Sequence, residues 1–107
     1  MKANINISNT YINFSNNQNK NGIEILACEF DIKIKNIIIK FIENSIIKYS
    51  EYIDISKSIH EQLMEKLGGK WDVTVGDRNK YISTHNSISA LGVNAGPYKI
   101  LVKYFGQ

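Results

Sequence analysis

Hydrophobic and polar positions divide the chain into an irregular first part and a patterned remainder. Residues 1–21 are rich in Asn and low in apolar content, and only Ile5 and Ile7 alternate with polar neighbours as a short strand would. The apolar run IEILACEF, which begins just after Gly22, predicts a half-buried strand. We therefore expect residues 1–21 to be an N-terminal extension, either flexible or a weak strand, and residues 22–107 to be one folded domain.

Two helical patterns follow this strand. In DIKIKNIIIKFIENSIIKYS, spacings of three and four residues place one helical face at Ile34, Ile38, Phe41, Ile42, Ser45 and Tyr49. In the second pattern, the carboxylate of Asp54 is expected to cap the first free backbone N–H groups. Glycine adopts the left-handed conformation of a helix C-cap, so Gly68-Gly69 is expected to end that helix. Its buried face repeats every four residues at Ile55, Ile59, Leu63 and Leu67.

After the second helix the hydrophobic period changes to two. The segments KWDVTVG, NKYISTHNSISALGVN and PYKILVKYF predict strands separated by turns of Gly, Asp, Asn and Pro. A strand, two helices and then a run of strands is typical of an α+β domain with an antiparallel sheet. We therefore expect two helices packed on an antiparallel β-sheet of about five strands.

The composition narrows the class of protein. With 107 residues, 43% of them hydrophobic, the chain fits one globular domain with a modest core, so burial against a second copy would add stability. The single cysteine, Cys28, excludes an internal disulfide, and with two histidines it cannot complete a structural metal site. No apolar run is long enough to span a membrane, and the N-terminus lacks the apolar core of a signal peptide, so we expect a cytosolic protein with no membrane partner.

The charge pattern argues against nucleic-acid binding. The formal net charge is +3, from 13 basic and 10 acidic side chains. Twelve of the basic residues are Lys, dispersed along the chain, and Arg78 is the one Arg. Because Arg provides the forked donors that recognise phosphates and bases, we interpret the lysines as a solubilising surface and expect no nucleic-acid partner.

Few side chains in the sequence could carry catalytic chemistry. No nucleophile or oriented acid accompanies His60 or His85, and Cys28 lies in an apolar strand where a buried, inert thiol is expected. His85 is either a packed strand residue or a ligand-binding or pH-sensing one. We therefore expect neither enzymatic activity nor a cofactor.

The segment 80–89 points to a binding role. It alternates hydroxyl-bearing and apolar residues and has few charges, so an exposed edge of this kind would favour aggregation unless it were paired. Such edges are commonly filled by a second copy of the chain or by an extended peptide. The alternative is an ordinary internal strand.

Taken together, these residues resemble the small dynein light chains of types 1 and 2. The resemblance runs without gaps over about residues 24–105 and rests most on Trp71, then Val75-Gly76, then Thr84-His85. Further matching residues are Asp54, Ile55, Ile59, Leu63, Lys66 and Gly96. The resemblance implies a two-helix, five-stranded fold and a homodimer, in which the strand at about residues 80–87 crosses over to pair with the partner's sheet.

The resemblance also assigns residues to sites. It implies two symmetric grooves at the dimer interface, each taking an extended client segment as an added strand beside the start of the second helix. The implied groove residues are Asp54, Ile55, Asn79, Tyr81, Ile82, Ser83, Thr84, His85, Ala90, Gly92 and Asn94. The implied dimer-interface residues are Trp71, Asp72, Val73, Lys80, Tyr81, Ser83, His85 and Ser87.

The sequence departs from the family at several of these positions. Family members line the groove with aromatic side chains where this chain has Asn79, Ala90, Gly92 and Asn94. Ile53 stands where the family places a basic residue just before the second helix, and Asp72 where it often has His at the dimer interface. Fewer aromatic walls imply a smaller buried area, so we expect altered or weakened client choice.

The resemblance implies a non-catalytic adaptor subunit of a dynein motor complex. Its expected partners are a second copy of itself, segments of dynein intermediate or heavy chains, and other client peptides. Its expected location is cytoplasmic or axonemal, associated with microtubules. The alternative is a motor-independent dimerising scaffold or regulatory binding module with the same fold.

Overall fold

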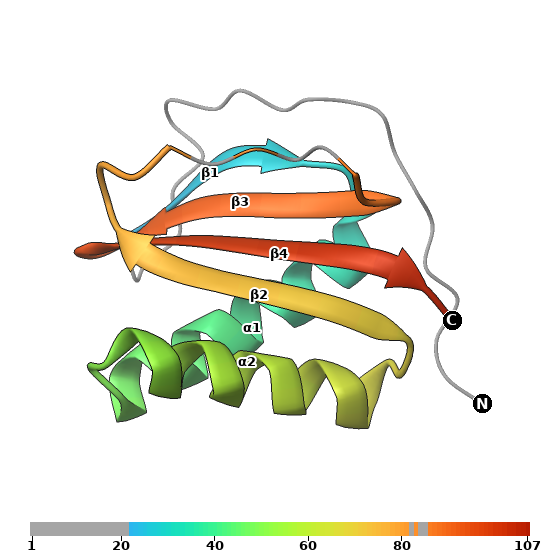
Figure 1. Ribbon diagram of the computed structural model, residues 1–107, viewed down its shortest axis with the longest axis horizontal. Coiled ribbons are helices and arrows are strands. Elements are labelled where there is room, and N and C mark those ends of the chain that lie inside the picture. The colour runs from blue at the N-terminus through green and yellow to red at the C-terminus, as the bar shows by residue number, and fades with distance from the viewer. Residues whose placement is uncertain (1–21, 82, 84–85) are drawn as a thin grey trace.

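A computed structural model describes residues 22–81, 83 and 86–107 of the chain. Its elements are β1 (Ile23–Cys28), α1 (Ile32–Lys48), α2 (Tyr52–Lys66), β2 (Lys70–Asp77), β3 (Ser89–Ala95) and β4 (Tyr98–Gly106), as Figure 1 shows. The expected N-terminal extension lies outside the described residues, as do the groove positions Ile82, Thr84 and His85.

The four strands form one antiparallel sheet in the order β1-β3-β4-β2. Both helices lie on the same face of this sheet (Figure 1), and α2 contacts both β2 and α1. The arrangement confirms the predicted α+β class. Neither helix of the described part is long and apolar enough to cross a membrane.

The sheet has four strands in the described residues, and the fifth strand that the resemblance implies, at about residues 80–87, stays a prediction because part of it lies outside those residues. The segment between β2 and β3 was expected to be a strand, yet none of its described residues is in one. Because β3 already pairs with β1 and β4, only the outer edges of β1 and β2 are left in this sheet for a further strand.

The first helix buries four of the six residues on the face that the sequence predicts, and the other two, Phe41 and Tyr49, are partly buried. Ile34, Ile38, Ile42 and Ser45 are buried. The carboxylate of Asp31 accepts a hydrogen bond from the backbone N–H of Ile34 at 2.9 Å, which caps the helix and was not predicted. Since β-branched residues are only moderate helix formers, this cap and the packing of the apolar face hold α1 together.

The second helix begins before the predicted residue. Ile55 N–H donates to the Glu51 carbonyl at 3.0 Å, so Asp54 lies inside the first turn and the prediction that it caps the helix is wrong. In that turn its negative charge still interacts favourably with the helix dipole. The predicted buried row from Ile55 to Leu67 is confirmed. The chain leaves the helix through Gly68, whose φ of 66° is the left-handed conformation that glycine allows.

The core lies between the helices and the sheet. Branched aliphatic side chains from both layers fill most of it, and an aromatic group closes one end. There, Trp71 packs 5.9 Å from Phe30 and 4.8 Å from Tyr104 between ring centroids, and its Nε1–H donates to the Gly68 carbonyl at 2.6 Å. With 7% of its surface exposed, Trp71 serves the core of its own chain.

Candidate functional site

The outer edge of β2 is the most open part of the sheet that carries expected site residues. In the described residues β2 pairs with β4 alone, so one row of its backbone N–H and C=O groups faces away from the sheet. Trp71, Val73 and Val75 turn toward the helices and the core, while Asp72 lies on the alternate side of the strand. An extended segment laid along this edge would find backbone donors and acceptors ready for pairing.

A groove of about 310 Å³ runs between this edge and α2. Its lining comes from both elements: Ser56, Lys57, His60, Glu61, Trp71, Asp72 and Val73. The three β2 residues are ones that the sequence assigned to the dimer interface. The four α2 residues were missed, although they form a second stripe with helical spacing beside the buried row of Ile55, Ile59 and Leu63.

The start of α2 carries two expected groove residues with different environments. The side chain of Asp54 is exposed, whereas Ile55 is fully buried and faces the core. Ile53, which stands where the family has a basic residue, lies within the first turn with 67% of its surface exposed. This end of the groove therefore presents a carboxylate and an apolar side chain.

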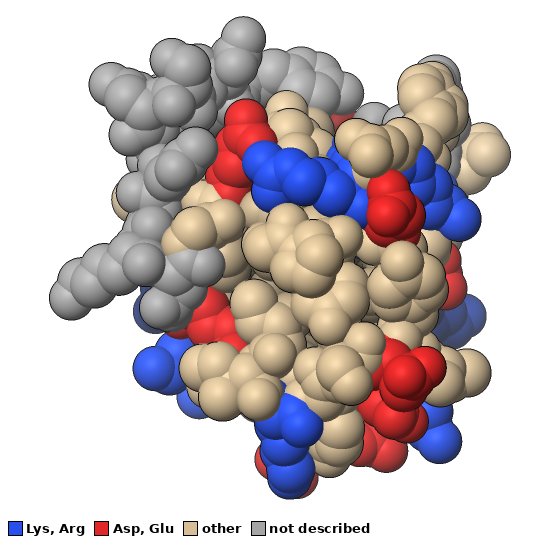
Figure 2. All heavy atoms as spheres, turned by 90° about the vertical axis from the view of Figure 1, so that its left-hand side faces the viewer, with Lys and Arg blue, Asp and Glu red and all other residues tan. Residues whose placement is uncertain are grey.

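Uncharged residues dominate the end of the molecule where α2 begins and β2 ends. Figure 2 shows this end face-on, with charged side chains mainly toward its periphery. Tyr52 packs edge-on against Tyr98 with ring centroids 6.0 Å apart, and the Tyr98 hydroxyl donates to the Ser50 carbonyl at 3.0 Å. These contacts fix the α1–α2 connection against β4.

The chain leaves β2 through a tight turn. The Asp77 carboxylate accepts from the backbone N–H of Asn79 at 2.8 Å, and Lys80 N–H donates to the Asp77 carbonyl at 2.9 Å. A Cβ added at Gly76 would lie 2.7 Å from Cδ of Lys80, so the Lys80 stem passes directly over Gly76. The first residues of the expected crossing strand therefore lie close to their own sheet.

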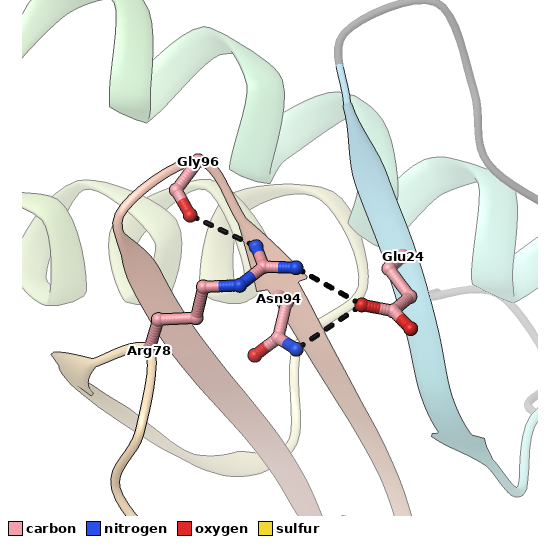
Figure 3. Close-up of polar contacts among 4 residues, drawn as sticks. All are labelled: Glu24, Arg78, Asn94 and Gly96. Atoms are coloured by element: carbon pink, nitrogen blue, oxygen red, sulfur yellow. Dashed lines mark hydrogen bonds and ion pairs between the residues drawn. The ribbon is translucent and has the colours of Figure 1, made fainter.

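Arg78 connects this turn, which follows β2, to the opposite edge strand β1, as Figure 3 shows. Its guanidinium donates to the Gly96 carbonyl at 3.0 Å and pairs with the Glu24 carboxylate at 3.1 Å. The amide of Asn94 donates to the same Glu24 oxygen at 3.2 Å. Asn94 is 8% exposed, and its side-chain oxygen Oδ1 is buried without a hydrogen-bond partner among the described residues. The cluster joins β1, β3, the β3–β4 turn and the exit from β2.

The structure separates the expected groove residues of β3 from those of α2. Leu91, Val93 and Ala95 point to the helix side and belong to the core. By alternation along the strand, Ala90, Gly92 and Asn94 face the opposite side of the sheet, and all three are buried. Within one chain, these three residues therefore do not meet Asp54 and Ile55.

The remaining expected site residues are spread along the connection from β2 to β3. Asn79, Lys80 and Tyr81 are exposed, and Tyr81 leaves 85% of its surface open. Ser83 and Ser87 are partly buried. The connection thus presents a large aromatic side chain to solvent.

Asp72 has an opposite charge beside it. In the antiparallel pairing of β2 with β4 it stands directly opposite Lys103. Cross-strand pairs of opposite charge attract each other modestly. Lys103 therefore offsets the repulsion that two Asp72 carboxylates would exert at a symmetric contact.

The single cysteine, Cys28, packs in the hydrophobic core. Cys28 is buried, and its Sγ–H donates to the Phe30 carbonyl at 3.4 Å. Burial raises the pKa of this thiol, which keeps it protonated. Among the described residues, no three His, Cys, Asp or Glu side chains come together in a way that could hold a metal ion.

Proteins of known structure share this fold. No protein-family model and no curated protein matches the chain. Two crystal structures of the dynein light chain-like domain of the Fasciola hepatica calcium binding protein FhCaBP2 do match. A mercury derivative gives a TM-score of 0.69 at 14% identity, covering 85% of this chain and 99% of that chain. A native crystal gives 0.67 at 14% identity, covering 80% and 93%. The chain therefore has a dynein light chain-like fold, at low sequence identity to these domains.

Proposed function

We propose that this protein is a non-catalytic adaptor that binds extended segments of client proteins by β-strand addition, as a homodimeric light chain of a dynein motor complex. The observation that carries the proposal is the unpaired outer edge of β2 beside the α2 groove. Backbone pairing along such an edge needs no particular client side chain. The dynein light chain-like fold supports the choice of motor complex.

The proposed dimer would use the connection between β2 and β3. Residues 80–87 of one copy would pair with the β2 edge of the other, and the client would add beside them, against α2. The exposed Tyr81 ring is apolar surface that such pairing could bury. A chain of 107 residues also gains proportionally more from added burial than a larger one does.

The proposal includes no enzymatic activity, no cofactor and no nucleic-acid or membrane partner. The expected location is the cytoplasm or axoneme, on microtubules. The matched Fasciola hepatica protein is called a calcium binding protein. Since the described residues show no metal-holding cluster, strand addition is the activity proposed for this chain.

Sedimentation equilibrium at pH 7 and micromolar concentrations, followed by co-sedimentation with dynein intermediate-chain and heavy-chain segments, tests the proposal. A dimer that binds such a segment supports it in full. A dimer that binds other extended peptides but no dynein segment identifies a motor-independent scaffold instead. A monomer that binds no extended peptide contradicts both.

A further inference from the structure

The outer surface of the helix layer carries a depression that is separate from the β2 edge. It lies where the first half of α1 passes the last turn of α2 and has a volume of about 330 Å³. We call it the helix pocket, and its lining residues are Asn36, Ile37, Lys40, Phe41 and Lys66. Since α2 contacts both α1 and β2, the helix pocket and the groove beside β2 lie on opposite sides of α2. A partner strand on the β2 edge would therefore leave the helix pocket open.

Two apolar side chains form the floor of the helix pocket. Ile37 and Phe41 are one turn apart on α1, and both are partly buried against the core. The other three lining residues, Asn36, Lys40 and Lys66, are exposed. Lysine side chains pack their aliphatic stems along apolar surface and keep the ammonium group in water. The helix pocket therefore combines an apolar floor with positive charge at its mouth.

Both charged residues that line the helix pocket are lysines. The one ion pair among the described residues joins Arg78 to Glu24, so neither Lys40 nor Lys66 is held in a salt bridge there. Lys66 lies in the last turn of α2, where the helix dipole favours a positive charge. Lys40 lies in the middle of α1, where the dipole gives no such reason for its charge. Both ammonium groups are thus available to a bound anion.

The acidic residues nearest in sequence do not cancel this charge. Glu43 follows Lys40 by one turn, but α1 contains four Lys and this one Glu. Glu65 precedes Lys66, but it lines a neighbouring depression together with Glu61. The charge around the helix pocket is therefore positive on balance.

Charge also decides which occupant matches the helix pocket. Residues 1–21 contain two Lys and no Asp or Glu, so this extension would add further positive charge. A second copy of the chain also brings a positive net charge, +3. A partner segment with an apolar side chain between carboxylates matches both features. Its apolar side chain would cover Ile37 and Phe41, while its carboxylates approach the two lysines.

We propose that the helix pocket binds a segment of a partner protein in which a large apolar residue is flanked by Asp or Glu. A volume of about 330 Å³ is at the lower end of the range for ligand sites, which matches a single apolar anchor. This site shares no residue with the groove used for strand addition, so the inference does not depend on the function proposed above.

Titration of the isotope-labelled full-length protein with a short synthetic peptide, followed by NMR, provides the test. The probe has a central Phe with Glu on both sides. One control peptide replaces the Phe by Ser, and the other replaces every Glu by Lys. We expect the probe to shift the amide signals of the five lining residues, and we expect neither control peptide to do so. Added NaCl should weaken the Kd of the probe, because salt screens charge pairs at a surface.

Charge-removing variants locate the interaction. Lys40→Gln and Lys66→Gln should each weaken the Kd of the probe by roughly two- to fivefold, the range expected for exposed charge pairs. Lys48→Gln removes the same charge from α1 outside the pocket lining, and should leave the Kd nearly unchanged. Circular dichroism of each variant verifies that the fold is intact.

Four results would overturn the proposal. The first is that no signal shifts, or that the shifts are confined to the groove between α2 and β2. The second is equal binding of the Ser control peptide, which would show that the apolar floor has no part in recognition. The third is an unchanged Kd for both Lys40→Gln and Lys66→Gln. The fourth is Lys40-dependent sedimentation with phosphatidylglycerol vesicles without peptide binding, which would identify a lipid-binding surface instead.

Discussion

The two faces of the sheet have opposite chemistry. The helix-covered face is built from branched aliphatic residues, and Ile23, Leu91, Val93, Ile100 and Val102 all have at most 1% of their surface exposed. The opposite face carries Glu24, Asn94, Lys99, Asp72 and Lys103, with small residues such as Ala90 and Gly92 between them. The first face is held by burial of large apolar side chains, and the second combines the buried Ala90 and Leu101 with a polar cluster around Glu24.

Because of this difference, we expect the two faces to contribute unequally to the stability of the protein and to its binding. Burial of apolar side chains contributes the larger free energy, since each fully buried Leu or Ile adds about 1.5–3 kcal/mol. Exposed ion pairs add about 0–1 kcal/mol each. Substitutions on the helix side should therefore unfold the protein, while substitutions on the opposite face and at the β2 edge should change what it binds.

The largest expected effect is in the core of the helix side. Ile59 is 0% exposed on α2, and Ile59→Ala should lower the free energy of unfolding by about 2–5 kcal/mol, because it leaves a cavity. Urea unfolding followed by circular dichroism measures this. Ile53→Ala is the matched control: that side chain is 67% exposed, and its loss should change stability by about 0.5 kcal/mol or less. Equal losses for the two variants would contradict the assignment of the core.

The second-largest expected loss of stability comes from removing one hydrogen bond on the helix side of the sheet. Trp71→Phe removes the N–H that the Gly68 carbonyl accepts, and leaves that oxygen without its buried partner. We expect a loss of about 1–3 kcal/mol, measured by urea unfolding. An unchanged unfolding midpoint would show that water replaces the indole as donor to this carbonyl.

On the opposite face the expected effect is smaller. Arg78→Gln breaks the ion pair with Glu24 and should cost about 0.2–1 kcal/mol, because both side chains are partly exposed. A double-mutant cycle with Glu24→Gln isolates the pair. Lys99→Gln removes a positive charge from the same face, and should change stability less than Arg78→Gln does. A coupling energy of zero would show that the cluster contributes nothing to stability.

The smallest effect concerns pH. Burial raises the pKa of Cys28 above its ordinary value of 9.0, so the thiolate is favoured in the unfolded chain. The stability gained from keeping the thiol protonated is present below pH 9.0 and is lost as the pH rises above it. Cys28→Ala should reduce this alkaline loss relative to the unsubstituted protein, as judged by urea unfolding at several pH values. A thiol reagent that modifies the native protein rapidly at neutral pH would contradict the buried state.

The helix faces were the most predictable part of the fold. Ile34, Ile38, Ile55 and Ile59 repeat at helical spacing, and the structure buries all four. β2 and β4 were equally predictable, because alternation of period two appears in the sequence itself, whereas the segment predicted as a strand before β3 is a described strand only from Ser89. The cap was misassigned to Asp54 because two acidic residues, Glu51 and Asp54, stand near the start of α2, and propensity does not choose between them.

The candidate site was less predictable, because it depends on which strands are neighbours. The resemblance assigned Trp71 to a dimer interface, which stays a prediction, whereas the packing of its indole on Phe30 and Tyr104 within one chain was not predicted. Lys57 and Glu61 were overlooked because exposed charges on a helix carry no signal of what lies opposite. Only the packing of α2 beside the open edge of β2 turns that stripe into a groove wall.

The pairing of β1 with β3 has a consequence for the making of this protein. In that pair Ile23 stands opposite Ala95, so this end of β1 cannot pair until the ribosome has synthesised a residue 72 positions later in the chain. At a synthesis rate of about 5–20 residues per second, this delay is roughly 4–14 s. During that time the apolar segment IEILAC has no sheet to join, and unpaired apolar strands associate with one another. The order of the strands thus leaves the nascent chain, more than the finished domain, open to association through an unpaired apolar strand.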